Sequence, residues 1–360
     1  MIDYHVSVTE KSLESYKVVM AGDFIISLRS FQGGIEYSRY HGICSPAYVV
    51  LRRRVKGSDE YFKQYFKTDR FICILTKNLE GLRDGKMISY AQFSELLLPV
   101  PYPVEQQKIA DCLNSADKLI AAQARKVDAL KSHKKALMQQ LFPRDGETVP
   151  RLRFPEFRDG GEWAVLPLAD LADRIMVGIA SAATHAYRDA GVLMLRNQNI
   201  KEGGIDDSSL IFIDSDYEVA HKNKRLRTGD VITVRTGYPG LSAVVTKRYE
   251  NAQCFTSLIT RPKKDVLDSD YLCLYINSPI GKKFILGAEA GGAQKNVNAG
   301  ALETLEVYHP RLEEQLKIAL CLSSLDNLIT AETQKLDALK THKKGLMQQL
   351  FPSPEGASAP

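Results

Sequence analysis

The chain has 360 residues and a formal net charge of +5 at pH 7, and 44% of its residues are apolar and 25% charged. These values are typical of a globular protein with two or three domains, and the small positive charge alone does not indicate a nucleic-acid partner. No stretch approaches the roughly 18 uninterrupted apolar residues of a membrane span, and the first residues, Met-Ile-Asp-Tyr-His, do not form a signal peptide. The six cysteines form no C-x-x-C pair and have no histidines at zinc-ligand spacing. We therefore expect a cytoplasmic protein with no bound metal and no membrane contact.

Residues 1–102 and 151–311 are predicted to form two β-rich domains that share a scaffold. Gly22–Arg29 resembles Gly229–Arg235, and Cys44–Tyr48 resembles Cys254–Leu258. Short β-branched runs bounded by Gly, Pro and Asn predict strands, and apolar segments between them predict short helices. In the second domain these are strands 231–234, 242–246 and 255–260, and helices 268–276 and 280–286.

The first domain is predicted to be incomplete. The second domain runs from Arg151 to about Asp206 before it reaches the segment that matches Met1, and this stretch holds the only tryptophan, Trp163. The first domain has no counterpart for the stretch, so we expect it to lack several strands. Either Met1 is an internal or misassigned start, or the chain is the product of a silent or rearranged gene copy.

Residues 103–143 and 312–352 are predicted to form two long helices, with a linker at 144–150 between the first helix and the second domain and a disordered tail at 353–360. The segment from Glu105 repeats from Glu314 at a constant offset of 209, and 27 of 39 positions are identical, which exceeds what a shared helical composition gives. Apolar residues recur in both copies at alternating spacings of four and three, the pattern of a coiled-coil seam. The predicted seam residues are Ile109, Leu113, Ile120, Val127, Leu130, Leu137 and Leu141 in the first copy and Ile318, Leu322, Leu325, Ile329, Leu336, Leu339, Leu346 and Leu350 in the second.

Two seam positions are polar in both copies, Gln123/Glu332 and Lys134/Lys343. We predict that the two seams pack against each other as an antiparallel coiled coil whose register these residues fix. The alternative is two unrelated amphipathic helices that pack on local cores. Outward-facing positions also match, which core packing does not require but binding of two copies of one partner does. The matched residues include Lys131/Lys340, His133/His342, Lys135/Lys344, Gln139/Gln348 and Gln140/Gln349.

These helices resemble the helical regions of type I restriction–modification specificity (S) subunits. The motifs are Glu-Gln-x-Lys-Ile-Ala at 105–110 and 314–319, Lys-Leu-Asp-Ala-Leu-Lys at 335–340 and His-Lys-Lys-Gly-Leu-Met-Gln-Gln-Leu-Phe-Pro at 342–352. Pro150–Phe157 with Trp163, Leu195–Ile200 and Arg235–Gly240 resemble parts of a target recognition domain. The resemblance extends over essentially the whole chain.

The resemblance implies an α+β fold with two β-rich target recognition domains, the first one incomplete here, separated by two long antiparallel helices that form a coiled coil. It implies a non-catalytic subunit that reads a bipartite, asymmetric target in double-stranded DNA. The implied partners are two modification subunits with adenine-N6 methyltransferase activity, and restriction subunits that form an ATP-dependent nuclease. No cofactor is expected in this chain, because S-adenosylmethionine, ATP and Mg²⁺ belong to the partner subunits. In agreement, the sequence has no G-x-x-x-x-G-K-[ST] loop.

Polar loops of the β-rich domains are the predicted DNA contacts, because Arg, Lys, Asn and Gln reach base edges and hydroxyl groups reach phosphates. The alternative for each loop is a solvated turn. In the second domain the candidates are Arg196, Asn197, Asn199, Arg235, Thr236, Tyr238, Gln294, Lys295 and Asn296. In the first domain the matching places hold Arg29, Ser30, Gln32 and Lys86.

Two other functions remain open. The chain could be the specificity subunit of a related bipartite system in which methylase and nuclease share one polypeptide. It could also be a scaffold or decoy that binds the methylase without reading DNA, an alternative raised by the incomplete first domain.

Overall fold

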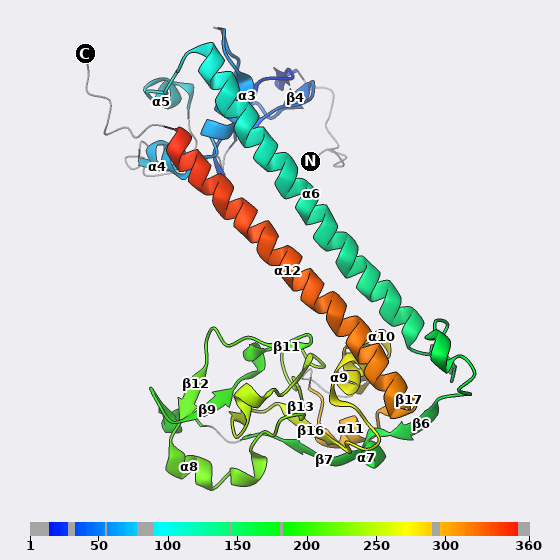
Figure 1. Cartoon of the computed structure of the whole chain (residues 1–360). Coiled ribbons are helices and arrows are strands. Elements are labelled where there is room, and N and C mark those ends of the chain that lie inside the picture. Colours follow the sequence, from blue (N-terminus) through cyan, green and yellow to red (C-terminus); the bar gives the residue numbers. More distant parts are fainter. Residues whose placement is uncertain are drawn as a thin grey trace. The chain divides into compact units, whose positions relative to one another are not determined.

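The computed structural model describes residues 14–27, 33–54, 56–77, 89–144, 146–180, 183–289 and 296–351. The chain divides into two compact units, Met1–Val127 with Ala331–Pro360, and Asp128–Thr330. Each unit contains one β-rich domain and a part of both long helices (Figure 1). Within these ranges no helix is long and apolar enough to cross a membrane. The predicted tail at 353–360 lies outside the described residues.

The two long helices are α6 (Pro103–Leu141) and α12 (Leu312–Leu350), each of 39 residues. They lie side by side and antiparallel (Figure 1). All the predicted seam residues are buried or half-buried, so the apolar face with four-three spacing is the covered face of each helix.

The polar seam residue Gln123 pairs with its own repeat counterpart, Glu332, in the first unit. Its Nε2 donates a hydrogen bond to Glu332 Oε2 at 2.6 Å and to the Glu332 carbonyl at 2.9 Å. Lys126 Nζ approaches the other carboxylate oxygen at 2.5 Å. The hydrogen bond from Lys126, followed by that from Gln123, lowers the pKa of Glu332.

The second polar seam position forms the same ion pair once in each unit. Lys343 Nζ donates to Asp117 Oδ1 at 2.6 Å in the first unit, and Lys134 Nζ donates to Asp326 Oδ1 at 2.6 Å in the second. Adding the offset of 209 to Asp117 and Lys134 gives Asp326 and Lys343, so the repeat makes the two ion pairs equivalent. The polar seam positions therefore form hydrogen bonds and ion pairs between the two helices in this register.

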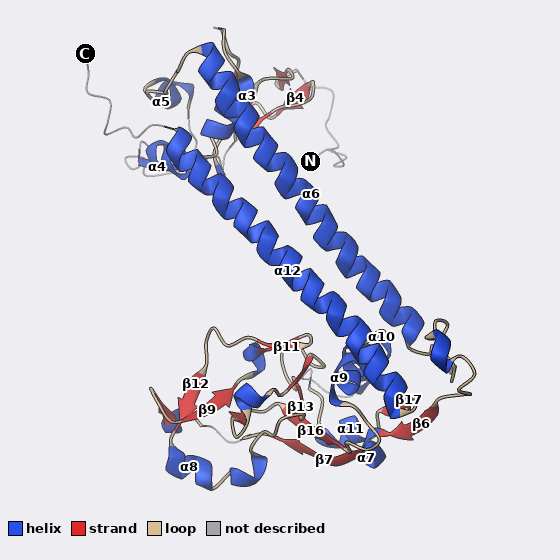
Figure 2. Cartoon of the chain, viewed as in Figure 1, coloured by secondary structure: helices blue, strands red, loops and turns tan. Residues whose placement is uncertain are grey.

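The first β-rich domain is built on a three-stranded sheet of order β3-β2-β5 beside the two-stranded antiparallel sheet β1-β4. Short helices cover the sheet (Figure 2). Its elements are β1 (Lys17–Val19), β2 (Phe24–Ile26), β3 (Glu36–Tyr37), β4 (Gly42–Cys44), β5 (Val49–Leu51), α3 (Asp59–Tyr65), α4 (Asp69–Lys77) and α5 (Tyr90–Ser94).

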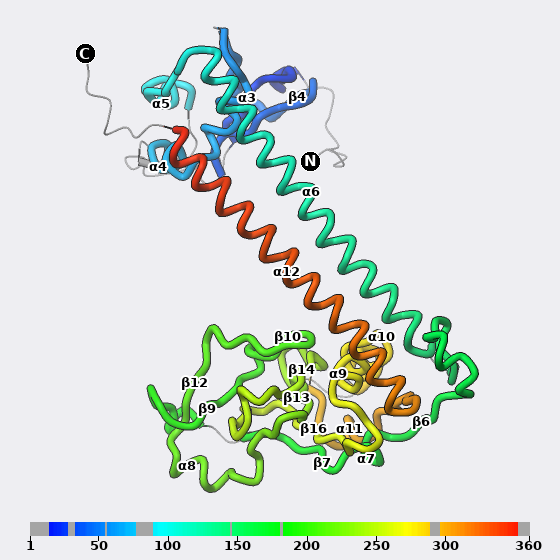
Figure 3. Tube along the Cα trace, viewed as in Figure 1, coloured from blue at the N-terminus to red at the C-terminus, as the bar shows by residue number. Residues whose placement is uncertain are grey.

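The second β-rich domain has two four-stranded sheets, of order β14-β13-β16-β7 and β15-β9-β12-β8, and the pairs β17-β6 and β10-β11. The hairpin β10-β11 lies against β14 (Figure 3), where the Gly203 N–H donates to the Ser242 carbonyl at 2.9 Å. The strands are β6 (Ala164–Pro167), β7 (Ala172–Val177), β8 (Tyr187–Arg188), β9 (Val192–Leu195), β10 (Ile200–Lys201), β11 (Gly204–Ile205), β12 (Ile211–Ile213), β13 (Val231–Thr233), β14 (Ser242–Val244), β15 (Gln253–Cys254), β16 (Leu258–Pro262) and β17 (Glu306–His309). The helices are α7 (Leu168–Leu171), α8 (Ser215–Val219), α9 (Ser269–Asn277), α10 (Pro279–Glu289) and α11 (Ala299–Glu303).

The predicted elements of the second domain are found close to their expected positions. The exception is the strand predicted from Phe255, which begins at Leu258. Thr256 has a positive φ of 58°, and such a backbone cannot continue a strand.

The central strand of each domain begins with the same ion pair. Asp23 accepts hydrogen bonds from Arg52 Nε and Nη2 at 2.7 and 2.6 Å. Asp230 accepts the equivalent bonds from Arg261 at 2.8 Å each. Bonding to the guanidinium lowers the pKa of Asp23. The two domains therefore share a scaffold in their packing as well as in their sequence.

A buried glutamine ties each long helix to the domain that precedes it. Gln106 Oε1 accepts from the backbone N–H of Ser58, and Gln315 Oε1 from that of Asp268, both at 2.9 Å. Each amide also donates to the carbonyl of the proline five residues earlier. Because both bonds end on backbone atoms, the attachment is independent of the side chains that differ between the domains.

The core of the second domain is completed by two helix ends. Phe142, directly after α6, packs against Tyr271 and Tyr275 with ring centroids 5.5 and 5.7 Å apart. Ile318 and Leu322, near the start of α12, belong to the same buried cluster.

The first domain repeats this arrangement with the helices exchanged. Phe351, directly after α12, lies 5.4 Å from both Tyr61 and Tyr65, and Ile109 and Leu113 of α6 complete the cluster. Each domain therefore packs on the start of the helix that follows it and on the end of the other helix.

A buried ion pair at the start of α12 allows a test of this attachment. Arg153 donates from Nε and Nη2 to Glu314, both at 2.7 Å, and both side chains are buried. We expect Glu314→Ala to lower the free energy of unfolding by about 3–5 kcal/mol, because Arg153 would be left buried and unpaired. Glu105→Ala, the exposed position one repeat earlier, should change it by less than about 0.5 kcal/mol. Urea denaturation followed by circular dichroism measures both values, and equal losses would contradict the prediction.

Candidate nucleic-acid interface

The first predicted DNA-reading loop follows strand β9 and forms the short 3₁₀ helix η3 (Asn197–Asn199). Asn199 Oδ1 accepts from the Arg196 backbone N–H at 2.9 Å, and its Nδ2 donates to the Asp206 carbonyl at 2.9 Å. The side chain of Asn199 is only 1% exposed. The prediction that Asn199 reads DNA does not agree with this geometry, because its amide is used to shape the loop.

Arg196 is held across the same loop. Its Nη2 donates to the Ser209 carbonyl at 2.8 Å, and its Nε is buried with no hydrogen-bond partner among the described residues. The next exposed side chain, Gln198, donates to Ser209 Oγ at 3.1 Å. Arg196 and Gln198 therefore present polar groups from fixed positions at the surface of the loop.

The second predicted loop connects β13 to β14. The Gly240 N–H donates to the Val234 carbonyl at 3.0 Å, which closes the turn, and Gly237 has a φ of 89°, a conformation that glycine adopts without strain. Tyr238, at the tip of this turn, is 80% exposed. A large aromatic side chain is thus held in solvent by a tight turn.

Asn197 joins the first loop to the second and to a third. Its Nδ2 donates to Thr236 Oγ1 at 2.9 Å, while its Oδ1 accepts from Ser257 Oγ at 2.8 Å. On the other side of the turn, Arg235 Nε donates to Asn296 Oδ1 at 2.7 Å. The structure therefore brings the described members of all three predicted loops together at the end of the β13-containing sheet.

The loop with Thr256 and Ser257 is a part of this cluster that sequence reasoning missed. Thr256 Oγ1 accepts from Asn197 Nδ2 at 3.4 Å. No motif marks these hydroxyl residues in the sequence, and their role depends on the positive φ of Thr256, which a strand-like sequence does not reveal.

Acidic groups near the first loop are stabilised by hydrogen bonds and ion pairs within the protein. The backbone N–H of Ser208 lowers the pKa of Asp206, with a smaller contribution from Lys201. Asp207 forms an ion pair with Arg248. The negative charges of this turn are therefore already balanced within the protein, so they repel an anion at the cluster less strongly.

Six of the candidate residues lie outside the described residues. They are Arg29, Ser30, Gln32, Lys86, Gln294 and Lys295. The candidate interface is accordingly defined in the second domain by Arg196, Gln198, Arg235, Thr236, Tyr238 and Asn296, with Asn197 and Asn199, whose amides bond within the protein, as positioning residues. Among the described residues, no group of three or more His, Cys, Asp or Glu side chains is placed to hold a metal ion.

Comparisons with known proteins agree with this architecture. A model of the type I restriction modification DNA specificity domain matches residues 161–341. The specificity subunit of the type I restriction enzyme MjaVIII from Methanocaldococcus jannaschii is 24% identical over 359 residues, which cover 96% of this chain and 81% of that protein.

Two solved structures share the fold. One comes from a study of complex assembly and conformational transition of the type I R-M system, with a TM-score of 0.59, 18% identity, and coverage of 94% of this chain and 83% of that one. The other is the type I restriction–modification S subunit from M. genitalium, with a TM-score of 0.55, 13% identity, and coverage of 94% and 85%.

The fold and the family match together define a non-catalytic DNA-recognition protein with an α+β fold. The chain belongs to the family of type I restriction–modification specificity subunits.

The hub position of Asn197 leads to a prediction about loop order. We expect Asn197→Ala to lower the free energy of unfolding by about 1–2 kcal/mol, because the buried hydroxyl of Ser257 and the exposed hydroxyl of Thr236 each lose a hydrogen bond. It should also speed amide hydrogen exchange in residues 235–240. Gln198→Ala, at the exposed neighbouring position, should do neither. Hydrogen-exchange mass spectrometry distinguishes the two variants, and unchanged exchange in Asn197→Ala would show that the loops do not depend on this contact.

Proposed function

We propose that this chain reads a bipartite, asymmetric target in double-stranded DNA, with one part read by each β-rich domain. Two adenine-N6 modification subunits dock on its helices, and restriction subunits complete the assembly. The complex acts on DNA in the cytoplasm. The observation that carries the reading role is the cluster of three loops joined through Asn197 and Asn296.

The loop cluster has the chemistry that base recognition needs. Arg and amide side chains form paired hydrogen bonds with base edges in the major groove, and Arg196 and Gln198 are presented at the cluster surface. The exposed ring of Tyr238 adds a surface that can pack against a sugar or a base. Because internal hydrogen bonds hold the loops, little ordering would be needed on binding.

A bipartite target is supported by the repeated scaffold with different loops. The ion pairs Asp23–Arg52 and Asp230–Arg261 place β2 and β13 in equivalent positions. The sequence after β2, Ser-Leu-Arg-Ser-Phe-Gln-Gly, differs from Val-Arg-Thr-Gly-Tyr-Pro-Gly after β13. Two equivalent scaffolds with different loops would read two different sequences.

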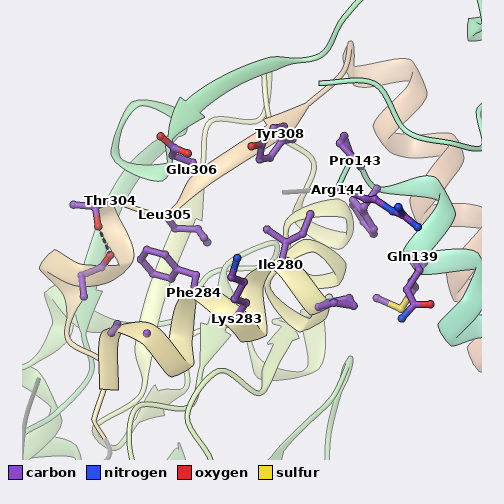
Figure 4. Close-up of a pocket in the computed structure, with 16 residues that line it drawn as sticks. Gln139, Pro143, Arg144, Ile280, Lys283, Phe284, Thr304, Leu305, Glu306 and Tyr308 are labelled. Atoms are coloured by element: carbon purple, nitrogen blue, oxygen red, sulfur yellow. Dashed lines mark hydrogen bonds between the residues drawn. The ribbon is translucent and has the colours of Figure 1, made fainter. Parts of the chain in front are cut away.

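Docking of two equal partners is supported by the exposed face of the helices. His133 and His342 are both exposed, as are Gln139 and Gln348, and none of them is needed for the seam. Near Gln139 the end of α6 borders a cavity of about 860 Å³ (Figure 4), and near Gln348 the end of α12 borders one of about 340 Å³. Matched side chains beside a hollow at each helix end suit two copies of one partner.

The reading role predicts a change in the methylated sequence. In cells that express the chain with its modification subunit, we expect Tyr238→Ala and Arg196→Ala to weaken recognition of one part of the target. Each lost contact corresponds to about 1–3 kcal/mol, or roughly a 5- to 150-fold loss of discrimination. Lys264→Ala removes an exposed cation beyond the opposite end of β16 and should leave the motif intact. Single-molecule sequencing of methylated adenine measures the motif. A wild-type chain that supports no site-specific methylation would favour the scaffold or decoy function.

The docking role predicts a change in stoichiometry. We expect His133→Glu or His342→Glu alone to reduce the complex from two modification subunits to one, and the double variant to remove both. Each substitution places a negative charge within a cationic face, so it changes the charge that the partner meets there. Lys118→Glu, at an exposed and unmatched position, should keep two subunits bound. Native mass spectrometry counts the subunits, and two retained subunits in the double variant would place the docking surface elsewhere.

A further inference from the structure

Arg235 and Asn296 form a fixed pair just after β13, although they lie 61 residues apart in the sequence. The Val297 N–H donates to the Arg235 carbonyl at 3.2 Å, and Thr236 and Asn296 form an antiparallel β-bridge. Arg235 Nε donates to Asn296 Oδ1 at 2.7 Å. Both side chains are half-buried, so backbone and side-chain contacts together hold the guanidinium in one place.

The hydrogen bond between these side chains decides how the Asn296 amide is turned. A guanidinium has donors and no acceptor, so the amide oxygen must face it and Nδ2 must face away. The Nη1 and Nη2 groups of Arg235 and the Nδ2 group of Asn296 form no other hydrogen bond among the described residues. The pair therefore leaves a set of N–H donors at the loop cluster.

A set of donors matches the edge of one base. In the major groove guanine presents two acceptors, O6 and N7, whereas adenine presents an acceptor beside a donor and cytosine presents a donor. The two terminal nitrogens of an arginine reach O6 and N7 together with good geometry. Because Asn296 already holds Nε, the two terminal nitrogens of Arg235 remain for such a contact.

The other Arg and amide side chains of the cluster are engaged differently. Arg196 uses Nη2 on the Ser209 carbonyl, so it does not offer both terminal nitrogens. Asn197 uses its nitrogen and its oxygen within the protein. Gln198 donates from Nε2 to Ser209 Oγ and keeps an acceptor, Oε1, which does not suit guanine. Among the described cluster residues, Arg235 is thus the one with the pattern of a guanine reader.

We propose that Arg235 determines specificity for a guanine in the part of the target read by the second domain, and that Asn296 is the positioning residue that holds its guanidinium. The inference rests on the proposed DNA-reading function and names the base that one side chain recognises. A phosphate group is the other acceptor that a guanidinium binds through two hydrogen bonds, and it carries no sequence information. The fixed direction of Arg235 favours the base, because attraction to a phosphate needs no such anchor.

The methylated sequence gives the first test. In cells that express the chain with its modification subunit, we expect the wild-type motif to contain a guanine at which Arg235→Ala loses about ten-fold or more in discrimination. The other positions should stay as they are. Arg227→Ala removes an exposed arginine at the opposite end of β13 and should leave the whole motif unchanged. Single-molecule sequencing of methylated adenine measures the motif of each variant.

A modified base separates base contact from phosphate contact. 7-Deazaguanine lacks the N7 acceptor but keeps its pairing with cytosine. In anisotropy titrations with the purified complex of chain and modification subunit, this base at the assigned guanine should weaken binding of the wild type about ten-fold. Arg235→Ala should bind both duplexes within about two-fold of each other. A phosphate contact would instead make Arg235→Ala weaker on every duplex and leave its sensitivity to 7-deazaguanine intact.

The positioning role of Asn296 has its own readout. Asn296→Ala should lose part of the discrimination at the same guanine and at no other position, and the double variant should be no worse than Arg235→Ala. A role in loop folding alone would weaken discrimination at several positions of the motif. Circular dichroism verifies that each variant folds.

Three results would overturn the inference while leaving the reading function in place. They are a wild-type motif without guanine, an unchanged guanine in Arg235→Ala, and an equal cost of 7-deazaguanine in the wild type and Arg235→Ala. A wild-type chain that supports no site-specific methylation contradicts the reading function itself, and this inference with it.

Discussion

The structure depends on one packing arrangement, in which each β-rich domain completes its core with the end of a helix from the other half of the chain. Phe142 closes the second domain against Tyr271, and Phe351 closes the first against Tyr61. Neither domain core is complete with its own residues alone. Because buried aromatic side chains contribute several kcal/mol each to stability, pairing of the helices and folding of the domains are coupled.

This coupling explains why polar residues lie in the helix seam. A slip of one helix along the other would withdraw Phe142 and Phe351 from their pockets together. The pairs Lys134–Asp326 and Gln123–Glu332 form in one register only, so they disfavour such a slip at the cost of some apolar contact. The register therefore fixes how each helix end meets its domain, and this requirement accounts for the matching polar residues of the two seams.

The helices could be predicted from the sequence, and much of the reading cluster could not. Four-three spacing over 39 residues, seen twice, is a long-range pattern that few structures satisfy, so Ile109 and Ile318 could be assigned to a buried face directly. The polar residues of a loop follow no repeating pattern, so their positions in the structure cannot be assigned in this way. Asn197 and Asn199 are both amides in one polar run, yet Asn199 is buried and Asn197 joins three loops. Only the positions of their partners separate these roles: Thr236 lies 39 residues from Asn197, and Asp206 lies in the next strand connection after Asn199.

The first domain shares its contacts with the long helices with the second domain. It has the ion pair of Asp23 with Arg52, and Tyr61 and Tyr65 of α3 contact Phe351 after α12. The parts that the helices require are therefore present in both domains. At each helix end, the turn that inserts Phe142 or Phe351 into a domain also carries Gln139 or Gln348 on its exposed side. The proposed docking face and the domain core are thus two sides of the same helical turn, so a partner held there would contact the element that closes the reading domain.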